Sequence, residues 1–254
     1  MEDVYIVGAA RTPMGGMQGA LADAPASQLG GVAIAAALAA GDVAPDDVNE
    51  VLMGCVLPGG QGQAPARQAA FAAGLGEDVP ATTINKMCGS GMKATMMGYD
   101  QLALGHGQVM VAGGMESMTQ APYLLPKMRG GARLGHGQVQ DSMFLDGLED
   151  AYDKGRLMGT FAEDCAMHFQ FSRAAQDAYA LRSLERALAA QASGAAAAEI
   201  APVTLVGRKA TVEVVMDEQP GNARPDKIPQ LKPAFRQGGT VTAANSSSIS
   251  DGAA

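Results

Sequence analysis

The sequence is poor in the residues that nucleic-acid-binding and membrane-spanning proteins use. It has no tryptophan, only 4% aromatic residues, no cluster of lysine and arginine, and a formal net charge of −8, which a nucleic-acid backbone would repel. Its longest apolar run, residues 32–40, is far shorter than the ~20 residues that a membrane-spanning helix requires. We therefore expect neither a nucleic-acid partner nor a membrane partner.

Cysteine is also scarce, with three residues at positions 55, 88 and 165. An odd number of cysteines without a C-x-x-C spacing fits neither a disulfide framework nor a structural zinc site. The chain begins with Glu2 and Asp3, where a secretory signal would carry positive charge. We therefore expect a cytoplasmic protein with reduced thiols and no bound metal.

The residues that are present predict a folded α/β protein. With 254 residues, 47% of them hydrophobic and 17% charged, the chain can bury a sizeable core. Short β-branched runs alternate with longer runs rich in alanine and leucine through the first 120 residues and again after residue 240, which is typical of a layered fold with a largely parallel sheet. Glycine, proline and polar residues interrupt the stretch between. We expect a sheet domain at 1–117, an inserted loop domain at 118–240 and a return to the first domain at 241–254.

Local patterns predict the individual elements. Strands are expected at residues 4–7, 48–57, 81–85, 109–112, 203–206, 211–216 and 240–243. Helices are expected at residues 27–40, 65–73, 91–104 and 161–191, the last of them divided near Ser172. Ser250 or Asp251 is a candidate cap for a further helix.

The stretch 82–94 carries the clearest chemical signal. A strand-like run leads into Cys88 and a helix follows, so the thiol is expected at a helix N-terminus, where free N–H groups and the helix dipole stabilise a thiolate. Gly89 and Gly91 leave the main chain open to a ligand, and the N–H group of Cys88 is a candidate donor to an oxyanion. These features predict a nucleophilic cysteine.

Two other interpretations of this stretch are open. A single cysteine is often a small buried hydrophobic residue. Residues 89–94 also fit the dinucleotide fingerprint G-x-G-x-x-A, with Glu116 after the next strand as a candidate ribose ligand. Asn85 and Lys86 disfavour the dinucleotide interpretation, because a buried parallel strand should be apolar there.

Seven motifs follow one another along the chain. They are Ala10-Arg-Thr-Pro-Met-Gly15, Gly62-Gln-Ala-Pro-Ala-Arg67, Asn85-Lys-Met-Cys-Gly-Ser-Gly-Met-Lys-Ala94, Gly113-Gly-Met-Glu-Ser-Met118, Met158-Gly-Thr-Phe-Ala-Glu163, Leu231-Lys-Pro-Ala-Phe235 and Thr240-Val-Thr-Ala-Ala-Asn-Ser-Ser-Ser-Ile-Ser-Asp-Gly-Ala253. Together they resemble the thiolases, a family of coenzyme A-dependent acyltransferases, from end to end of the chain. Two positions depart from the pattern: Leu157 stands where some members have histidine, and Ser248 replaces a common glycine.

The resemblance implies a layered fold and a cysteine-dependent reaction. Complete thiolases have two α/β halves in five layers, α-β-α-β-α, with a loop domain inserted in the first half. This chain would be the first half with its inserted loop domain, and the second half would be absent. Cys88 matches the nucleophile that takes an acyl group from acyl-CoA as a thioester. The positions that match coenzyme A-binding residues of the family are Met158, Arg224, Leu231, Phe235, Ala243 and Ser247.

The implied function is that of an acetyl-CoA C-acetyltransferase or 3-ketoacyl-CoA thiolase in fatty acid metabolism. Such an enzyme transfers an acetyl or longer acyl group between coenzyme A thioesters, either forming acetoacetyl-CoA or cleaving a 3-oxoacyl-CoA. Coenzyme A is part of substrate and product, so no separate cofactor is implied. The complete protein would be a homo-oligomer, either a dimer or a tetramer.

The resemblance leaves part of the catalytic apparatus unaccounted for. The family's second half carries an activating histidine and an acid/base cysteine that have no match in this sequence, so we expect the chain to be incomplete for turnover. A catalytically inactive module that binds coenzyme A or acyl-CoA is therefore an open alternative. A more remote one is an NAD-binding oxidoreductase that uses the turn at residues 89–94.

Overall fold

The computed structural model describes residues 3–208 and 210–254, which form two compact units. The sheet unit contains the chain up to residue 121 together with 195–218 and 250–254, and the insert unit contains 122–194 and 219–249. These boundaries differ from the expected insertion at 118–240, because residues 195–218 pack with the sheet unit and residues 241–249 with the insert unit.

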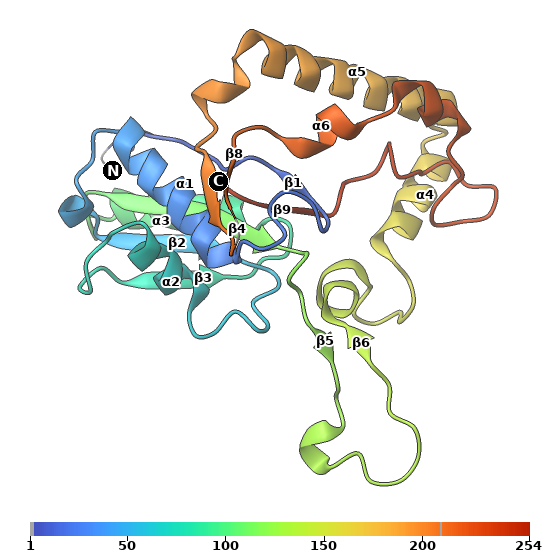
Figure 1. The fold of residues 1–254 in the computed structure, drawn as a ribbon, viewed down its shortest axis with the longest axis horizontal. Coiled ribbons are helices and arrows are strands. Elements are labelled where there is room, and N and C mark those ends of the chain that lie inside the picture. Colours follow the sequence, from blue (N-terminus) through green and yellow to red (C-terminus); the bar gives the residue numbers. More distant parts are fainter. Residues whose placement is uncertain (1–2, 209) are drawn as a thin grey trace. The chain divides into compact units, whose positions relative to one another are not determined.

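A mixed five-stranded sheet forms the centre of the sheet unit (Figure 1). Its strands, in spatial order, are β1 (Gly15–Gly16), β9 (Ser250–Ala253), β4 (Met110–Ser117), β2 (Glu50–Gly54) and β3 (Ala81–Ile84). β2 pairs in parallel with β3 and β4, whereas β9 runs antiparallel between β1 and β4. The α/β class expected from the sequence is confirmed.

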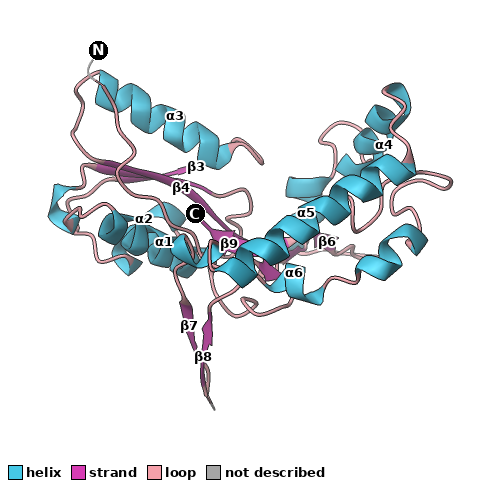
Figure 2. Ribbon diagram, turned by 90° about the horizontal axis from the view of Figure 1, so that it is seen from above, coloured by secondary structure: helices cyan, strands magenta, loops and turns pink. Residues whose placement is uncertain are grey.

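Helices cover both faces of this sheet. α1 (Ala26–Ala40) and α2 (Pro65–Ala72) lie on one face, and α3 (Ser90–Ala103) lies on the other (Figure 2). Successive side chains of β2 point to opposite faces of the sheet, as they do in any β-strand. Val51 and Met53 belong to the buried cluster that includes α1 and α2, whereas Leu52 approaches α3.

Local signals account for several helix limits. α1 begins at Ala26, one residue before the expected cap, and ends at Ala40; the N–H group of the next residue, Gly41, closes the last turn. α2 and α3 agree with the expected helices to within one residue. The expected break near Ser172 is confirmed, because its hydroxyl accepts the N–H of Ala175 at 3.2 Å and caps α5.

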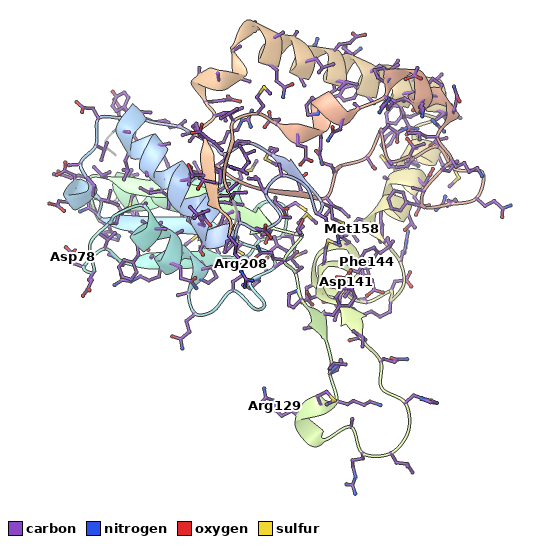
Figure 3. All side chains as sticks on the ribbon, in the orientation of Figure 1. Asp78, Arg129, Asp141, Phe144, Met158 and Arg208 are labelled. Carbon is purple, nitrogen blue, oxygen red and sulfur yellow. The ribbon has the colours of Figure 1, made fainter. Side chains whose placement is uncertain are left out.

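The insert unit consists of helices and one short hairpin. Its helices are α4 (Met158–His168), α5 (Arg173–Ser193), most of α6 (Glu218–Asn222) and the 3₁₀ helix Pro225–Gln230, with a π-helical turn at Phe144–Leu148. β5 (Tyr123–Leu124) pairs antiparallel with β6 (Gln140–Asp141), and Arg129 stands at the far end of the loop that joins them (Figure 3). Met128–Gly130 is a further 3₁₀ helix of this unit, whereas the 3₁₀ helices Pro45–Asp47 and Ala196–Ala198 belong to the sheet unit.

Residues 195–218 add a second hairpin to the sheet unit. β7 (Val203–Val206) pairs antiparallel with β8 (Thr211–Val214), as the β-branched runs predict. Val203 is fully buried in the core, and the Nε2 atom of Gln28 on α1 donates to the carbonyl of Thr204 at 3.4 Å. This hairpin therefore packs against the sheet unit although it follows the insertion in sequence.

Two expected strands do not form. Residues 4–7 form no strand, and the chain just after them pairs outside the central sheet, where Arg11 forms an isolated parallel bridge with Ile200. Residues 240–243 remain irregular because the carboxylate of Glu163 accepts the N–H groups of Thr240 and Val241. Both segments have strand character in sequence, but neither pairs as a strand, and residues 240 and 241 are bound by a side chain instead.

Two further predictions about strands and caps are wrong. Ser250 and Asp251 do not cap a helix, since they begin β9: Ser250 pairs with Gly16 of β1, and Asp251 pairs with Gly15 of β1 and Ser117 of β4. β4 runs on through Gly113 and Gly114 to Ser117, although a break was expected after residue 112. The two glycines pair with β2, which keeps their part of the chain extended.

No described helix combines the length and the apolar character needed to cross a membrane.

Candidate functional site

Cys88 lies in the turn between β3 and α3 with its side chain exposed. Gly89 is the N-cap residue of the 14-residue α3, so the thiol stands at a helix N-terminus, as the sequence predicts. Met87 has a left-handed φ of 51°, which a large side chain adopts only when its surroundings impose it. The turn is therefore a constrained feature that presents the sulfur outward.

Two polar side chains hold this turn. The hydroxyl of Ser90 accepts the N–H of Lys86 at 2.9 Å and donates to the carbonyl of Met87 at 2.5 Å. The side chain of Asn85 accepts the N–H of Met87 at 2.9 Å. The polar side chain of Asn85 thus shapes the turn, and Lys86 takes part through its main-chain N–H, so this lead-in is not the apolar strand of a dinucleotide fold.

A glycine at the end of β2 lets α3 approach the sheet closely. A Cβ atom on Gly54 would lie 2.6 Å from the Cβ of Ser90 and 2.9 Å from the nitrogen of Gly91, distances that real side chains do not reach. Gly91 in turn faces the backbone of Gly113, where a Cβ would lie 3.6 Å from the carbonyl oxygen. The first turn of α3 is therefore set by backbone packing at the carboxyl ends of β2 and β4.

A second cysteine is buried on the other side of β2. Cys55 is 1% exposed, and its thiol lies 3.5 Å from Oε1 of Glu116. Burial, followed by the nearby carboxylate, raises the pKa of Cys55 to about 12. Burial also raises the pKa of Glu116, although its oxygens accept the N–H groups of Val56 and Leu57 at 2.8 and 3.1 Å.

These contacts separate the two candidate cysteines. The interpretation of Cys88 as a small buried residue is wrong, because Cys88 is exposed at a helix start; Cys55 is the cysteine that is buried in this way. The carboxylate of Glu116 is taken up by the loop after β2, so it is not displayed as a ribose ligand. Within the described residues, no three His, Cys, Asp or Glu side chains are grouped to hold a metal ion.

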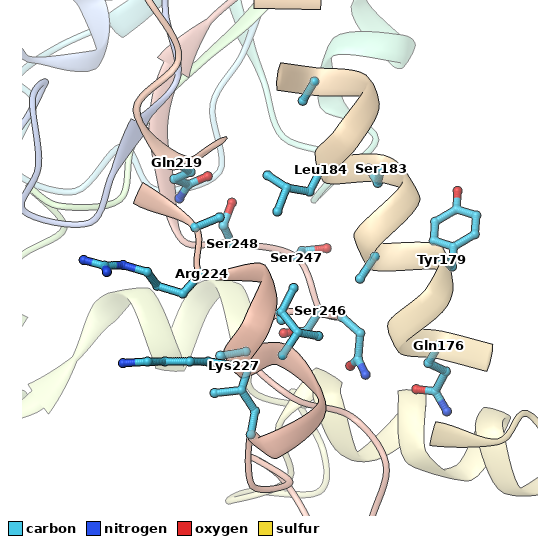
Figure 4. Close-up of a pocket in the computed structure, with 18 of the residues that line it drawn as sticks. Gln176, Tyr179, Ser183, Leu184, Gln219, Arg224, Lys227, Ser246, Ser247 and Ser248 are labelled. Carbon is cyan, nitrogen blue, oxygen red and sulfur yellow. The ribbon is translucent and has the colours of Figure 1, made fainter. Parts of the chain in front are cut away.

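The insert unit contains a cavity of about 1120 Å³ (Figure 4). Three segments line it: one face of α5, the chain from Gln219 to Leu231, and the loop 243–248. The α5 residues include Ala175, Tyr179, Ser183 and Ala187, which are four positions apart and therefore share a face of the helix. Such a volume exceeds that of a typical small-molecule site and suits an elongated ligand.

The walls of the cavity differ in chemistry. Small and apolar side chains of α5 form one wall, and Arg224 and Lys227 bring positive charge to another. Both cations extend to the same side of their segment, away from α5 (Figure 4). The loop 243–248 adds the hydroxyl groups of Ser246, Ser247 and Ser248. A ligand with an apolar body and anionic groups would match these walls.

The structure gathers four of the six expected coenzyme A residues in this cavity. Arg224, Leu231, Ala243 and Ser247 all line it. Met158 and Phe235 do not, although they lie near each other in the same unit. The Phe235 ring covers Gly159, the neighbour of Met158, so closely that a Cβ on this glycine would lie 2.3 Å from the ring. Cys88 belongs to the sheet unit and the cavity to the insert unit.

Sequence reasoning missed Gln176, Tyr179 and Lys227, which line the same cavity. The signal for the two α5 residues was present in the sequence. Alanine and serine recur four residues apart on this helix and so lie on one face of it. A face of small side chains is typical of close packing in a core, but it can also leave space beside the helix for a ligand. Lys227 follows Arg224 by one helical turn, a spacing that aligns the two cations on one side.

Comparison with known proteins agrees with these features. The model of the thiolase N-terminal domain matches residues 4–254. The chain is 51% identical to acetyl-CoA acetyltransferase 2 of Arabidopsis thaliana, with 99% of this chain and 63% of that protein covered. It is 48% identical to the acetyl-CoA acetyltransferase of Schizosaccharomyces pombe, with 99% and 64% covered.

A solved structure has the same fold. The crystal structure of Acat5 thiolase from Ascaris suum in complex with coenzyme A is similar with a TM-score of 0.92 and 37% identity, covering 99% of this chain and 64% of that one. The chain thus spans less than two thirds of the length of these relatives. The family model and these relatives together show that the chain belongs to the thiolase family and carries its N-terminal domain.

Proposed function

We propose that this chain supplies the coenzyme A-binding and acyl-accepting part of an acetyl-CoA acetyltransferase. The complete enzyme would transfer an acetyl or acyl group between coenzyme A thioesters, forming acetoacetyl-CoA or cleaving a 3-oxoacyl-CoA. The observation that carries the proposal is the exposed Cys88 at the start of α3, in a protein of this family. The relatives named as acetyl-CoA acetyltransferases, and the Ascaris thiolase bound to coenzyme A, favour this substrate class.

The cavity of the insert unit is the proposed site for coenzyme A. Arg224 and Lys227 are suited to its phosphate groups, because a guanidinium binds phosphate through two hydrogen bonds and an ammonium binds it as a point charge. The apolar face of α5 would cover the less polar parts of the ligand, and the serine hydroxyls of loop 243–248 would hydrogen-bond its polar atoms. Leu231 adds apolar surface to the same site.

Cys88 would carry out the first half of the reaction. Its thiolate attacks the thioester carbonyl, a new S–C bond forms, the bond to the coenzyme A sulfur breaks, and the departing thiolate takes a proton. The N-terminus of α3 stabilises the attacking thiolate, and the main-chain N–H of Cys88 is the candidate donor to the oxyanion. The second half needs a base that removes the α-proton of another acyl-CoA, so the first half is the step to test on this chain.

The test is intact-mass spectrometry after brief incubation with acetyl-CoA. We expect one added acetyl group, absent from Cys88→Ala and retained by Cys165→Ala, which removes the other exposed cysteine. An adduct that persists in Cys88→Ala would contradict the role of Cys88. Binding of coenzyme A without any adduct would favour the catalytically inactive binding module instead.

Other properties of the complete enzyme are proposed on the resemblance alone. We infer a cytoplasmic homo-oligomer, either a dimer or a tetramer, that serves fatty acid metabolism. Coenzyme A would enter only as part of substrate and product, so activity would need no separate cofactor. Dialysis against a chelator should accordingly leave acyl transfer unchanged, and a loss of transfer that a metal ion restores would contradict this.

A further inference from the structure

The loop that forms one wall of the cavity has no regular secondary structure, yet its main chain is fixed. Residues 243–248 line the cavity, and residues 240–242 lead into them. Val241 and Thr242 are buried, with 3% and 0% of their surfaces exposed. One main-chain bond, from the N–H of Ala234 to the carbonyl of Val241 at 2.9 Å, holds this segment, and side chains elsewhere in the insert unit add to it.

One such side chain is Glu163 on α4, which is 4% exposed and does not line the cavity. Its Oε1 accepts the N–H groups of Thr240 and Val241 at 2.9 and 2.8 Å, and its Oε2 accepts the hydroxyl of Thr240 at 3.2 Å. These bonds outweigh burial and keep the pKa of Glu163 below its usual value, so the carboxylate is charged at neutral pH. A Cβ atom on Gly239 would overlap Oε1 of Glu163, so the carboxylate can lie here only because residue 239 is glycine.

The second is Asp177 on α5, which is 6% exposed and also lies outside the cavity lining. Its Oδ2 accepts Nε of Arg173 at 2.7 Å, and its Oδ1 accepts Nδ2 of Asn245 at 3.1 Å. Asn245 lines the cavity, and its Oδ1 accepts the N–H of Thr242 at 2.7 Å. Asp177 is thus connected to the cavity wall through one residue of the loop.

Buried carboxylates are costly unless they are hydrogen-bonded, and for Glu163 most of the compensation comes from the loop itself. Glu163 is bound chiefly by main-chain N–H groups, which a moved loop could not offer at the same distances. A displaced loop would leave the Glu163 charge without these partners, and Asp177, which keeps its ion pair with Arg173, would lose its bond to Asn245, so both carboxylates favour one loop position.

We propose that Glu163 and Asp177 are positioning residues that set the cavity wall 243–248 for coenzyme A. This inference rests on the proposed function of the cavity. Neither carboxylate touches the ligand; each acts through loop atoms, Glu163 through the main chain at Thr240 and Val241, and Asp177 through Asn245.

The test is calorimetric titration of the chain with coenzyme A. Glu163→Gln removes the negative charge and replaces one of the two oxygens that face the N–H groups of Thr240 and Val241 with an NH₂ group, and we expect it to weaken coenzyme A binding about tenfold. Glu185→Gln is the matched control, because Glu185 is an exposed glutamate of α5 outside the cavity lining, and it should bind as the parent does. Asp177→Asn keeps an oxygen that can accept the hydrogen bond from Asn245, so it should weaken coenzyme A binding less. This variant provides the test if Glu163→Gln does not fold.

A double-mutant cycle with Ser247→Ala distinguishes positioning from general destabilisation. If Glu163 acts through the loop, Ser247→Ala should cost less affinity in the Glu163→Gln background than in the parent, so the effects are not additive. Amide exchange should quicken at Thr240 and Val241 and stay unchanged along α5. Unchanged affinity, or strictly additive effects, would overturn the inference and leave the proposed function standing. A parent chain that binds no coenzyme A would overturn the proposed function, and the inference with it.

Discussion

At the scale of single residues, the surroundings of each cysteine decide its chemistry. The reactive form of a cysteine is the thiolate, so a raised pKa and burial both suppress reaction. Cys55 is buried beside Glu116 with its pKa raised to about 12, whereas Cys88 and Cys165 are exposed. Cysteine is therefore a buried core residue at position 55 and a candidate nucleophile at position 88.

This contrast predicts selective alkylation. Iodoacetamide at about pH 8 should label Cys88 and Cys165 in the folded chain and leave Cys55 unmodified, because its thiol is both inaccessible and protonated. Peptide mapping by mass spectrometry measures the labelling, and the same reaction in guanidinium chloride should label all three cysteines. Rapid labelling of Cys55 in the folded chain would show that its burial is incomplete in solution.

A second residue-scale contact joins the chain near β1 to the segment before α6. Arg11 donates to both oxygens of Asp217 at 2.7 and 2.9 Å, and the N–H of Met14 donates to Oδ1 at 2.9 Å. Burial raises the pKa of Asp217, but these hydrogen bonds and the charge of Arg11 lower it by more, so its pKa lies below the usual 3.8.

Asp217 should therefore make stability depend on acid. A pKa that is lower in the folded than in the unfolded chain stabilises the fold above about pH 4, and this contribution is lost as the pH falls through the folded value. Asp217→Asn should lower the free energy of unfolding by about 1–3 kcal/mol at pH 7 and flatten its dependence on pH in acid. Urea titrations across this pH range provide the measurement, with the exposed Asp46→Asn as control. An equally steep acid dependence in Asp217→Asn would rule out this origin.

At the scale of elements, the sequence predicts best what is decided locally. α2, α3 and the break between α4 and α5 agree with expectation because proline at a first turn, helical periodicity and the Ser172 cap act within a few residues. Residues 240–243 and 250–253 were misassigned because their partners are distant in sequence: Glu163 for the first, and β1 and β4 for the second.

The contact of α3 with the end of β2 is an element-scale feature that can be tested. Gly54→Ala would place a methyl group 2.6 Å from the Cβ of Ser90, so the first turn of α3 must shift. We expect a loss of about 1–3 kcal/mol in unfolding free energy and weaker acetylation of Cys88. Gly137→Ala is the matched control, because nothing lies within 4 Å of its Cβ position, and it should change neither quantity. A stable Gly54→Ala variant with full acetylation would contradict this account of the turn.

At the scale of the whole molecule, the candidate site is divided between the two units. The Cys88 motif is continuous in sequence and could be recognised directly, whereas the cavity is assembled from segments between Phe171 and Ser248. Arg224 and Ser247 were found only through the family resemblance, and Tyr179 was missed because its helix face resembles an ordinary core face. Residues that approach each other only through folding leave no short motif in the sequence.

This division predicts where a ligand stabilises the molecule. Saturating coenzyme A should slow amide exchange in α5, in residues 219–231 and in the loop 240–248, because a ligand stabilises the unit that binds it, by ~2.7 kcal/mol at a hundred times the dissociation constant. Exchange in β2 and β3 should stay unchanged. Hydrogen exchange read by mass spectrometry makes the comparison, and protection confined to the sheet unit would place the site elsewhere.

The central sheet unites residues from opposite ends of the sequence, since β9 (Ser250–Ala253) lies between β1 (Gly15–Gly16) and β4 (Met110–Ser117). A ribosome makes β1 and β4 long before β9, and the whole insert unit is translated in the interval. Until residue 250 emerges, β4 has an open edge on one side and β1 has no strand to join, and an open edge invites pairing with other chains. The nascent chain therefore carries an unpaired strand edge, open to misassembly, over the 130 or so residues that separate β4 from β9.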